Sequence, residues 1–507
     1  MTTAGIALLR ERARADAALR LLPMLTDAPL HLVGGAVRDA LGGATGGVVT
    51  DWDIAVPTDA VPLARRWADA VGGAFVSLHE THATARVVGE TARYDLAAYR
   101  APTLEGDLRA RDLTVNAIAV DLRALLAGND APCIDPCGGV RDLENSLLRP
   151  CGPDVFAADP VRVVRLYRFV ATLGCAPTAE ADAQAAAVLA RGGGSDSGAT
   201  WWQSVAPERV TDELAQLFVA PAAGDAANGA IMRLADAGVL DAFVPHWAET
   251  RGLAQGRNHD LDVCGHDVHA AAIVAGQFLP RLDEWMAPHA DALRQWLDVP
   301  VGGERTRRWL VPFAALLHDV GKAVTYTIKP NGRPDFTGHE IAGGHIAAQV
   351  AASLRLSRAE RKLLVACVRL HGYPNALQRH GPDHPLRFFA VAGEAAPGVI
   401  LVATGDRATA NGPARPPEKV ARDVSFLLNL TRDYFGTWAP LLATPPLVRG
   451  DDVMAALGLA PGKRVAELLL LLRRRQLEGA LTARDAAIAA IRPIFAVRHG
   501  GEDRPGW

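Results

Sequence analysis

Two aspartates, Asp51 and Asp53, stand one residue apart in the run DWDIAV. Alternate side chains of a β-strand project to the same face, so we expect both carboxylates on one face and Trp52, Ile54 and Val56 toward a core. Two adjacent negative charges are costly unless a cation lies between them, and Mg²⁺ is held by one or two carboxylates together with substrate phosphates. Two such ions can activate an attacking hydroxyl and stabilise a leaving pyrophosphate. The alternative for this pattern alone is a solvated strand edge.

Two further features could complete such a site. Asp95, in the run RYDL, could supply a third carboxylate from a neighbouring strand, or it could be an exposed strand residue. The run LVGG, which ends at Gly34 and Gly35, predicts a strand, a tight turn and a helix start. Glycine lets the backbone approach a ligand closely, and the free N–H groups of a helix start bind anions such as a triphosphate. The alternative is a turn without a ligand.

Asp159 and Arg162 are three residues apart in a helical pattern, which predicts that they share one helix face. An Asp accepts from an amino group, and an Arg donates to a ring nitrogen or carbonyl. Cytosine and adenine both present an amino group beside an acceptor, whereas uracil and guanine do not. One Asp–Arg pair could therefore accept C and A without a nucleic-acid template. The alternative is a helix start, with Asp159 as N-cap and Pro160 as the first helical residue.

Five ordered stretches carry a family resemblance. They are LVGGAVRDALGG with DWDIAV, LRARDLTVNAIAVD (108–121), IDPCGGVRDLENSLLR (134–149), AADPVRVVRLYRF (157–169) and APERVTDEL (206–214). Together they resemble the motifs of the class II tRNA nucleotidyltransferase and bacterial poly(A) polymerase family. Two positions depart from that pattern, because Ala158 stands where the family usually has Glu and Ala110 where it usually has Arg.

The resemblance implies a role for each of these residues. Asp51, Asp53 and Asp95 would be catalytic, and the first two would hold Mg²⁺. The implied nucleotide-binding residues are Gly34, Gly35, Arg38, Arg111, Asp112, Asn116, Asp159, Arg162 and Arg165. Without the resemblance, a surface ion pair would be the simpler interpretation of Arg111 and Asp112. The implied partners are tRNA, CTP and ATP.

A second set of possible ligands lies in a His-rich region from about residue 256 to 425. Imidazole and carboxylate together suit a divalent transition metal such as Ni, Mn, Fe or Zn. An isolated His on a helix is more often packed or solvated, so the order of the set matters. That order resembles the His-Asp (HD) phosphohydrolase superfamily, which one bacterial branch of the nucleotidyltransferase family carries after its head. The implied ligands are His266, His318, Asp319 and Asp406, with His339 and His371 at the extra positions of two-metal members.

These sites need several domains to position them, and 507 residues are too many for one core. We expect an α+β fold, with a nucleotidyltransferase head on a mixed β-sheet at 1–150. An all-α neck and body would follow at 151–255, an HD domain at 256–430 and a helical tail at 431–507, which could dock tRNA or only pack. We see no apolar run near 18 residues and no signal peptide, so we expect a soluble cytoplasmic protein without a membrane partner. The net charge of -3 argues neither for nor against RNA binding.

The expected activity is template-independent addition of CMP and AMP to the tRNA 3′ end, with a second HD-type phosphohydrolase activity. Three alternatives stay open: poly(A) polymerase, addition of only CC or only A, and a phosphohydrolase whose head merely binds RNA. Intact Asp51, Asp53, Asp159 and Arg162 count against the last. The oligomeric state stays open.

Overall fold

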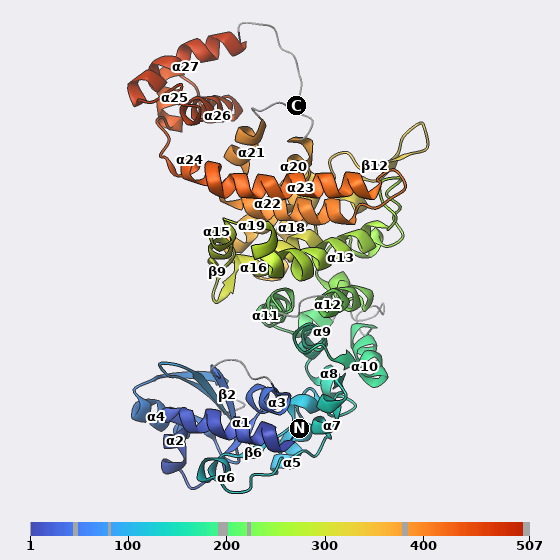
Figure 1. The fold of residues 1–507 in the computed structure, drawn as a ribbon, viewed down its shortest axis with the longest axis vertical. Coiled ribbons are helices and arrows are strands. Elements are labelled where there is room, and N and C mark those ends of the chain that lie inside the picture. Colours follow the sequence, from blue (N-terminus) through green and yellow to red (C-terminus); the bar gives the residue numbers. More distant parts are fainter. Residues whose placement is uncertain are drawn as a thin grey trace. The chain divides into compact units, whose positions relative to one another are not determined.

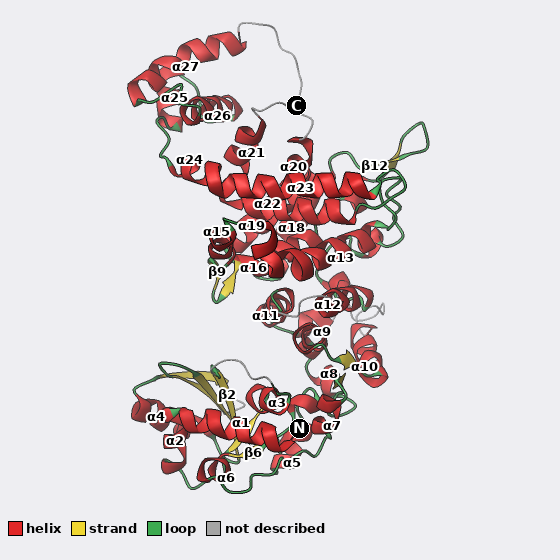
Figure 2. Cartoon of the chain, viewed as in Figure 1, coloured by secondary structure: helices red, strands yellow, loops and turns green. Residues whose placement is uncertain are grey.

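A computed structural model describes residues 2–43, 49–79, 83–190, 201–220, 225–377 and 384–499 (Figures 1 and 2). The chain divides into two compact units. The first comprises Met1–Ala222 and Asp236–Ala242, and the second comprises Ala223–Ala235 and Phe243–Trp507. The first unit holds a sheet and helices and the second is mainly helical, which confirms the predicted α+β fold.

The first unit is built around a six-stranded sheet with the order β3-β4-β5-β2-β1-β6. Its strands are β1 (His31–Val33), β2 (Asp51–Val56), β3 (Ala74–His79), β4 (Thr84–Val88), β5 (Arg93–Ala98) and β6 (Val120–Asp121). The sheet is mixed, as predicted, because β2 and β5 run parallel while the other neighbouring strands pair antiparallel.

Strand β2 has the alternation that its sequence predicts. Trp52, Ile54 and Val56 are buried in the main core of the head, whereas Asp51 is exposed and Asp53 is partly exposed. The apolar face of β2 therefore anchors the strand, and its other face carries both carboxylates.

Helices surround this sheet and continue beyond it. They are α1 (Thr2–Ala15), α2 (Ala17–Leu21), α3 (Gly35–Leu41), α4 (Ala60–Val71), α5 (Leu104–Arg109), α6 (Leu122–Ala127), α7 (Gly139–Glu144), α8 (Val155–Ala158), α9 (Val161–Leu173), α10 (Ala179–Ala190) and α11 (Pro207–Phe218). The next helix, α12 (Asp225–Asp236), belongs to the second unit except for its last residue. A short parallel pair, β7 (Leu147–Leu148) and β8 (Ala176–Pro177), joins the end of the head to the residues after α9. Helices α9 and α11 pack against each other.

The second unit is centred on α13, α16, α19 and α22, which pack on one another (Figure 1). Its helices are α13 (Val263–Ile273), α14 (Leu282–Trp285), α15 (Ala290–Leu297), α16 (Arg307–Leu316), α17 (Lys322–Thr325), α18 (His339–Ser353), α19 (Arg358–Leu370), α20 (Gly372–Leu377), α21 (His384–Ala392), α22 (Ala396–Thr409), α23 (Pro417–Asp433) and α24 (Ala439–Ala443). Two hairpins interrupt them, β9 (Pro300–Gly302) with β10 (Arg305–Thr306) and β11 (Thr327–Ile328) with β12 (Pro334–Asp335). Neither hairpin was predicted.

The last helices, α25 (Gly450–Leu457), α26 (Lys463–Leu477) and α27 (Arg484–His499), share a hydrophobic cluster of their own. One prediction about apolar runs was wrong. Arg387–Thr409 is long and apolar enough to cross a membrane, with a mean hydropathy of 1.6. Its most apolar window is 78% buried inside the protein, which is the behaviour of a core helix.

Candidate functional site

The parallel pairing of β2 with β5 brings three carboxylates together at one end of the sheet. Asp53 lies directly opposite Asp95, and Asp51 lies opposite Arg93. Arg93 donates to Asp51 at 2.9 Å, and both oxygens of Asp95 accept from Arg86 at 2.7 and 2.8 Å. The predicted neighbouring strand for Asp95 is therefore confirmed, and its catalytic role stays a prediction.

Gly34 approaches the Asp53 carboxylate more closely than any other residue type could. It has φ of +72°, and a Cβ at this position would lie 2.5 Å from Asp53 Oδ2. Burial raises the pKa of Asp53, the Arg111 guanidinium opposes this, and the nearby carboxylates of Asp95 and Asp51 add to it. A half-buried carboxylate with like charges beside it fits a site that gains a cation.

A pocket of about 330 Å³ opens beside Asp53. Its lining residues are Gly34, Gly35, Arg38, Asp53, Arg100, Arg111, Asp112, Asn116, Arg162, Arg165, Arg168 and Phe169. Six of these are arginines and two are aspartates, so the lining favours a polyanion such as a triphosphate. The structure thus brings together most of the predicted nucleotide-binding residues. Asp51, Asp95 and Asp159 do not line this pocket.

A chain of hydrogen bonds fixes the pocket wall. Arg38 donates to Asn116 Oδ1 at 2.7 Å, and the Asn116 amide donates to Asp112 Oδ1 at 3.3 Å. Arg165 donates to Asp112 Oδ2 at 3.0 Å and to Glu213 at 2.7 Å. Burial alone would raise the pKa of Asp112, but the Arg165 guanidinium and the Leu113 amide outweigh it and hold that pKa below its usual range.

The predicted shared helix face of Asp159 and Arg162 was wrong. Asp159 lies before α9 in extended backbone with φ of −148°, because the residue before a proline is disfavoured in the helical region. The N-cap alternative also fails, since Pro160 is the N-cap of α9 and no side chain caps it. The two side chains still form an ion pair, with Arg162 Nε 3.7 Å from Asp159 Oδ2. Arg209 of α11 donates to both Asp159 oxygens at 3.0 and 2.7 Å.

Three lining residues had not been predicted: Arg100, Arg168 and Phe169. The guanidinium of Arg168 lies 4.1 Å from the Phe169 ring centroid, and that of Arg38 lies 5.1 Å from it. Arg168 follows Arg162 by two steps of three residues, a spacing that could have revealed it. Arg100 lies in the turn after β5, where no pattern marks it.

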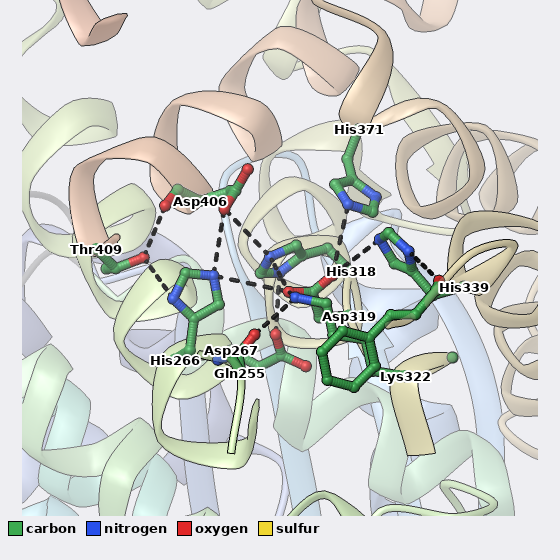
Figure 3. A network of polar contacts seen from close by, with 12 residues as sticks. Gln255, His266, Asp267, His318, Asp319, Lys322, His339, His371, Asp406 and Thr409 are labelled. Atoms are coloured by element: carbon green, nitrogen blue, oxygen red, sulfur yellow. Dashed lines mark hydrogen bonds and ion pairs between the residues drawn. The ribbon is translucent and has the colours of Figure 1, made fainter. Parts of the chain in front are cut away.

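The second unit contains a buried cluster of His and Asp side chains (Figure 3). His266 comes from α13, His371 follows α19 and Asp406 lies on α22, while His318 and Asp319 follow α16. Asp319 Oδ2 lies 3.4 Å from His318 Nε2, and Asp406 Oδ1 lies 3.3 Å from His266 Nε2. All of these residues are those predicted as metal ligands.

Asp319 also faces a second pair of imidazoles. Its Oδ1 lies 3.3 Å from His339 Nε2 and 3.6 Å from His371 Nε2. One carboxylate is therefore shared between two groups of candidate ligands, an arrangement that suits two neighbouring cations. Lys322 is ion-paired with the same Asp319 and was not predicted.

The outward nitrogens of this cluster are already occupied. Nδ1 of His318, His339 and His371 lies 2.7 to 3.0 Å from backbone carbonyl oxygens, and Nδ1 of His266 lies 3.2 Å from the Thr409 hydroxyl. By contrast, the buried Nε2 atoms of His266 and His318 have no hydrogen-bond partner among the described residues. Ligating histidines are held in this way, so the residues fit a divalent metal.

The charge states also fit. Burial lowers the pKa of His318 to about 3, and it lowers that of His371 as well. Burial would raise the pKa of Asp319, but Lys322 and His318 outweigh it and hold that pKa well below its ordinary value. Neutral imidazoles beside an ionised carboxylate are the forms in which these groups bind metals.

Known proteins are similar to this chain both in its head and along most of its length. Residues 30–149 match the family described as the poly A polymerase head domain. The chain is 37% identical over 443 residues to the A-adding tRNA nucleotidyltransferase of Deinococcus radiodurans, covering 86% of this chain and 89% of that protein. The chain belongs to the tRNA nucleotidyltransferase family. The predicted membership is therefore confirmed.

Other relatives of this nucleotidyltransferase differ in the product that they are named for. It is 30% identical over 457 residues to the CC-adding tRNA nucleotidyltransferase of Geobacter sulfurreducens, covering 90% of this chain and 89% of that one. It is also similar to a solved CCA-adding enzyme in complex with ATP, with a TM-score of 0.57 and 17% identity over 96% of this chain and 98% of that one. The last similarity shows the fold.

Proposed function

We propose that this nucleotidyltransferase adds CMP and AMP, taken from CTP and ATP, to the 3′ end of tRNA in the cytoplasm. The single observation that carries the proposal is the arginine-rich pocket of about 330 Å³, which opens directly beside Asp53 and its strand neighbours. A triphosphate held there would have its reacting phosphate near the carboxylates. The relatives named for A and CC addition support the same substrate class.

The reaction assigns distinct tasks to the residues. The terminal RNA hydroxyl oxygen bonds to the α-phosphorus, the bond from that phosphorus to the bridging oxygen breaks, and pyrophosphate and the hydroxyl proton leave. Asp51 and Asp53 would hold Mg²⁺, which when bound favours the attacking hydroxyl and neutralises charge on the pyrophosphate. Arg38 and Arg111 would bind the phosphates, and Asn116 would keep Arg38 in place through its 2.7 Å hydrogen bond.

Base choice would rest on Asp159 and Arg162. The carboxylate accepts from the amino group of cytosine or adenine, and the guanidinium donates to the adjacent acceptor. The Asp159 side chain is 23% exposed, and Arg209 fixes its orientation. We also propose the division into a head at 1–150, a neck and body at 151–255, an HD domain at 256–430 and a tail at 431–507.

One assay tests this function. The protein is incubated with three tRNA substrates, which lack the whole CCA end, only CA, or only A, together with each labelled NTP. Products are then sequenced. Growth of all three substrates to CCA supports the proposal. Long adenosine tails would instead indicate a poly(A) polymerase, and no growth of any substrate would overturn nucleotide addition.

Addition of A alone is the second candidate. It is favoured by the 37% identity, along nearly the whole chain, to the A-adding relative. In the same assay this candidate predicts growth only of the tRNA that already ends in CC. The opposite outcome is growth that stops at CC. It would indicate an enzyme of the kind for which the CC-adding relative is named.

We propose a second activity for the His/Asp cluster, metal-dependent hydrolysis of phosphomonoesters or 2′,3′-cyclic phosphates. Six candidate ligands meet there, and Asp319 faces both pairs of imidazoles. A divalent transition metal would generate the hydroxide nucleophile when bound. Lys322, beside Asp319, could bind the phosphate. Assay of the full chain with Ni²⁺, Mn²⁺, Fe²⁺ and Zn²⁺ in turn tests it, and no hydrolysis with any of them would overturn it.

A further inference from the structure

Two arginines, Arg86 and Arg93, lie among the carboxylates of the head. Arg86 on β4 is directly opposite Asp95 on β5, and Arg93 on β5 is directly opposite Asp51 on β2. Arg86 donates to both oxygens of Asp95, and Arg93 lies 2.9 Å from an oxygen of Asp51. The hydrogen bond with Asp95 raises the pKa of Arg86, whereas burial and the charge of the nearby Arg93 oppose this. Both cations therefore share one face of the sheet with the three carboxylates.

Neither ion pair contributes much to the stability of the fold. The side chains of Arg86 and Asp95 are 33% and 27% exposed, and those of Arg93 and Asp51 are 34% and 57% exposed. Ion pairs with this much exposure to water contribute only about 0–1 kcal/mol. The two guanidiniums can therefore exchange a carboxylate for another anion at little cost. A cation held by Asp51 would favour this exchange, because it would replace Arg93 as the counter-charge of that carboxylate.

The sheet places these arginines away from the arginine-rich pocket. That pocket is lined by Asp53 and by Gly34 and Gly35, which follow β1 on one side of β2. Arg86 and Arg93 do not line it, and they belong to β4 and β5, on the other side of β2. In-line displacement at phosphorus brings the attacking oxygen in opposite the leaving group. A triphosphate in the pocket therefore leaves the β5 and β4 side of Asp53 for the RNA hydroxyl.

We propose that Arg86 and Arg93 bind the backbone phosphates next to the 3′ end of the RNA that receives the nucleotide. A guanidinium forms two parallel hydrogen bonds to a phosphate as it does to a carboxylate, so both side chains are suited to this exchange. Binding of these phosphates holds the attacking hydroxyl beside Asp53. The inference rests on the proposed nucleotide addition and names the surface at which its RNA substrate binds.

The experiment compares two forms of the 3′-truncated tRNA that the protein extends best. One form has ordinary phosphates, and the other has uncharged methylphosphonates at its 3′-terminal linkages. On the ordinary RNA, Arg86→Gln and Arg93→Gln should each raise KM for tRNA about tenfold, the loss expected from one charge-assisted hydrogen bond. KM for the NTP should stay close to the wild-type value. On the uncharged RNA, the variants and the wild type should have similar KM values for tRNA, because the contact is already absent.

Two outcomes of these kinetics would overturn the inference. One is a KM penalty of the same size on both RNAs, which would show that the arginines do not act on the terminal phosphates. The other is a pair of variants that lose only kcat, the result expected if the arginines merely orient Asp95 and Asp51.

Binding without turnover gives an independent measure. The affinity of each protein for the ordinary tRNA is measured by filter retention over a range of salt concentrations. Loss of one phosphate contact should flatten the slope of log affinity against log salt by about 0.7. An unchanged slope in both variants would contradict the contacts. A wild-type protein that adds no nucleotide would overturn the proposed function, and the slopes would still decide whether Arg86 and Arg93 bind RNA.

Arg66→Gln is the matched control, because it removes the same charge from another part of the head. Arg66 is exposed on α4, whose Trp67 packs in the same core as Trp52 and so lies on the face of the sheet away from the carboxylates. Its salt slope and KM values should follow the wild type. An Arg66→Gln protein that loses as much as the other two variants would reveal an effect of net charge alone and overturn the assignment.

Discussion

Arg209 donates to both carboxylate oxygens of Asp159, at 3.0 and 2.7 Å, across 50 residues of sequence. The same carboxylate lies 3.7 Å from Arg162, which lines the arginine-rich pocket while Arg209 does not. A two-pronged contact fixes the plane of a carboxylate. The direction in which Asp159 presents its oxygens is thus set by a residue outside the pocket.

We therefore expect Arg209→Ala to lower the selectivity for C and A over U and G. Arg162→Ala, which removes a direct contact, should raise misincorporation about tenfold or more, since a bidentate base contact is worth roughly 1–3 kcal/mol. Arg209→Lys should stay impaired, because an ammonium cannot make the planar fork. The measurement is kcat/KM for each of the four NTPs. An Arg209→Ala enzyme as selective as the wild type would show that the Arg209–Asp159 ion pair only joins α11 to the chain before α9.

Asp51→Asn and Asp53→Asn should each abolish nucleotide addition while tRNA binding stays close to wild type. Each variant would lose one of the proposed metal ligands and little else, because the amide has nearly the same shape as the carboxylate. Addition is followed by gel extension of a 3′-truncated tRNA and binding by filter retention. Asp69→Asn, an exposed carboxylate on α4 of the same domain, is the matched control and should retain full activity. Normal turnover in either catalytic variant would remove the metal assignment.

Gly34→Ala should eliminate most nucleotide addition. The new Cβ would meet Asp53 Oδ2 at 2.5 Å, so the carboxylate has to move. Gly43→Ala is the control, since Gly43 has nearly the same positive φ, +76° against +72°, and nothing within 4 Å of its Cβ position. Both variants should lose about 1 kcal/mol of stability through backbone strain. Urea unfolding measures that loss, and equal activity in the two variants would contradict the role of the close approach.

His318→Ala and Asp319→Ala should remove metal-dependent hydrolysis and spare nucleotide addition. The two sites lie in different compact units and share no residue. They should also differ in metal preference, because carboxylates alone suit Mg²⁺ and mixed His/Asp sets suit transition metals. Both activities and the melting temperature are measured on each variant. Loss of both activities in a protein that melts like the wild type would argue against two independent sites.

His31 should make the stability of the head depend on pH. Burial lowers the pKa of this imidazole, and Asp121 and Glu105 only partly oppose the effect. Below about pH 6.5 the unfolded chain takes up a proton at His31 that the folded chain does not. Stability is therefore greatest above this pH and falls as the pH drops toward the folded-state pKa. His31→Asn should lose less melting temperature between pH 7.5 and 5.5 than the wild type, and an equal loss in both proteins would contradict this role of His31.

Local patterns predicted the carboxylates of the head well. The alternation of DWDIAV depends only on the period of a strand, and Trp52 and Ile54 are buried as that period requires. The helix start at Gly35 was also predicted, because two glycines before a helical pattern constrain the chain locally. Pro160 carries a local signal too: a proline disfavours helical backbone at the residue before it, so Asp159 lies before the helix and not on it, contrary to the prediction.

Contacts between distant elements could not be predicted in this way. Arg209 reaches Asp159 only because α11 packs against α9, and one sequence does not specify which charged residues meet across that packing. The position of Asp267 in the His/Asp cluster could not be predicted for a different reason. Adjacent residues on a helix point about 100° apart, so the sequence suggests that Asp267 faces away from the site of His266. The fold nevertheless brings an Asp267 oxygen within 4.8 Å of possible ligand atoms of His266, His318 and Asp319.

Arg165 has a consequence for how such enzymes can be recombined. It joins Asp112 of the head to Glu213 of α11 from its own position on α9, and both acids are buried. A chimera joined near residue 150 would keep Asp112 but not Arg165. The buried carboxylate would then lack its cation, at a cost of several kcal/mol of folding stability. A chimera cut after α11 would carry all three residues together. The transferable piece of this protein is therefore the head with the helices that complete its charges, and laboratory exchange between relatives should succeed at that later junction.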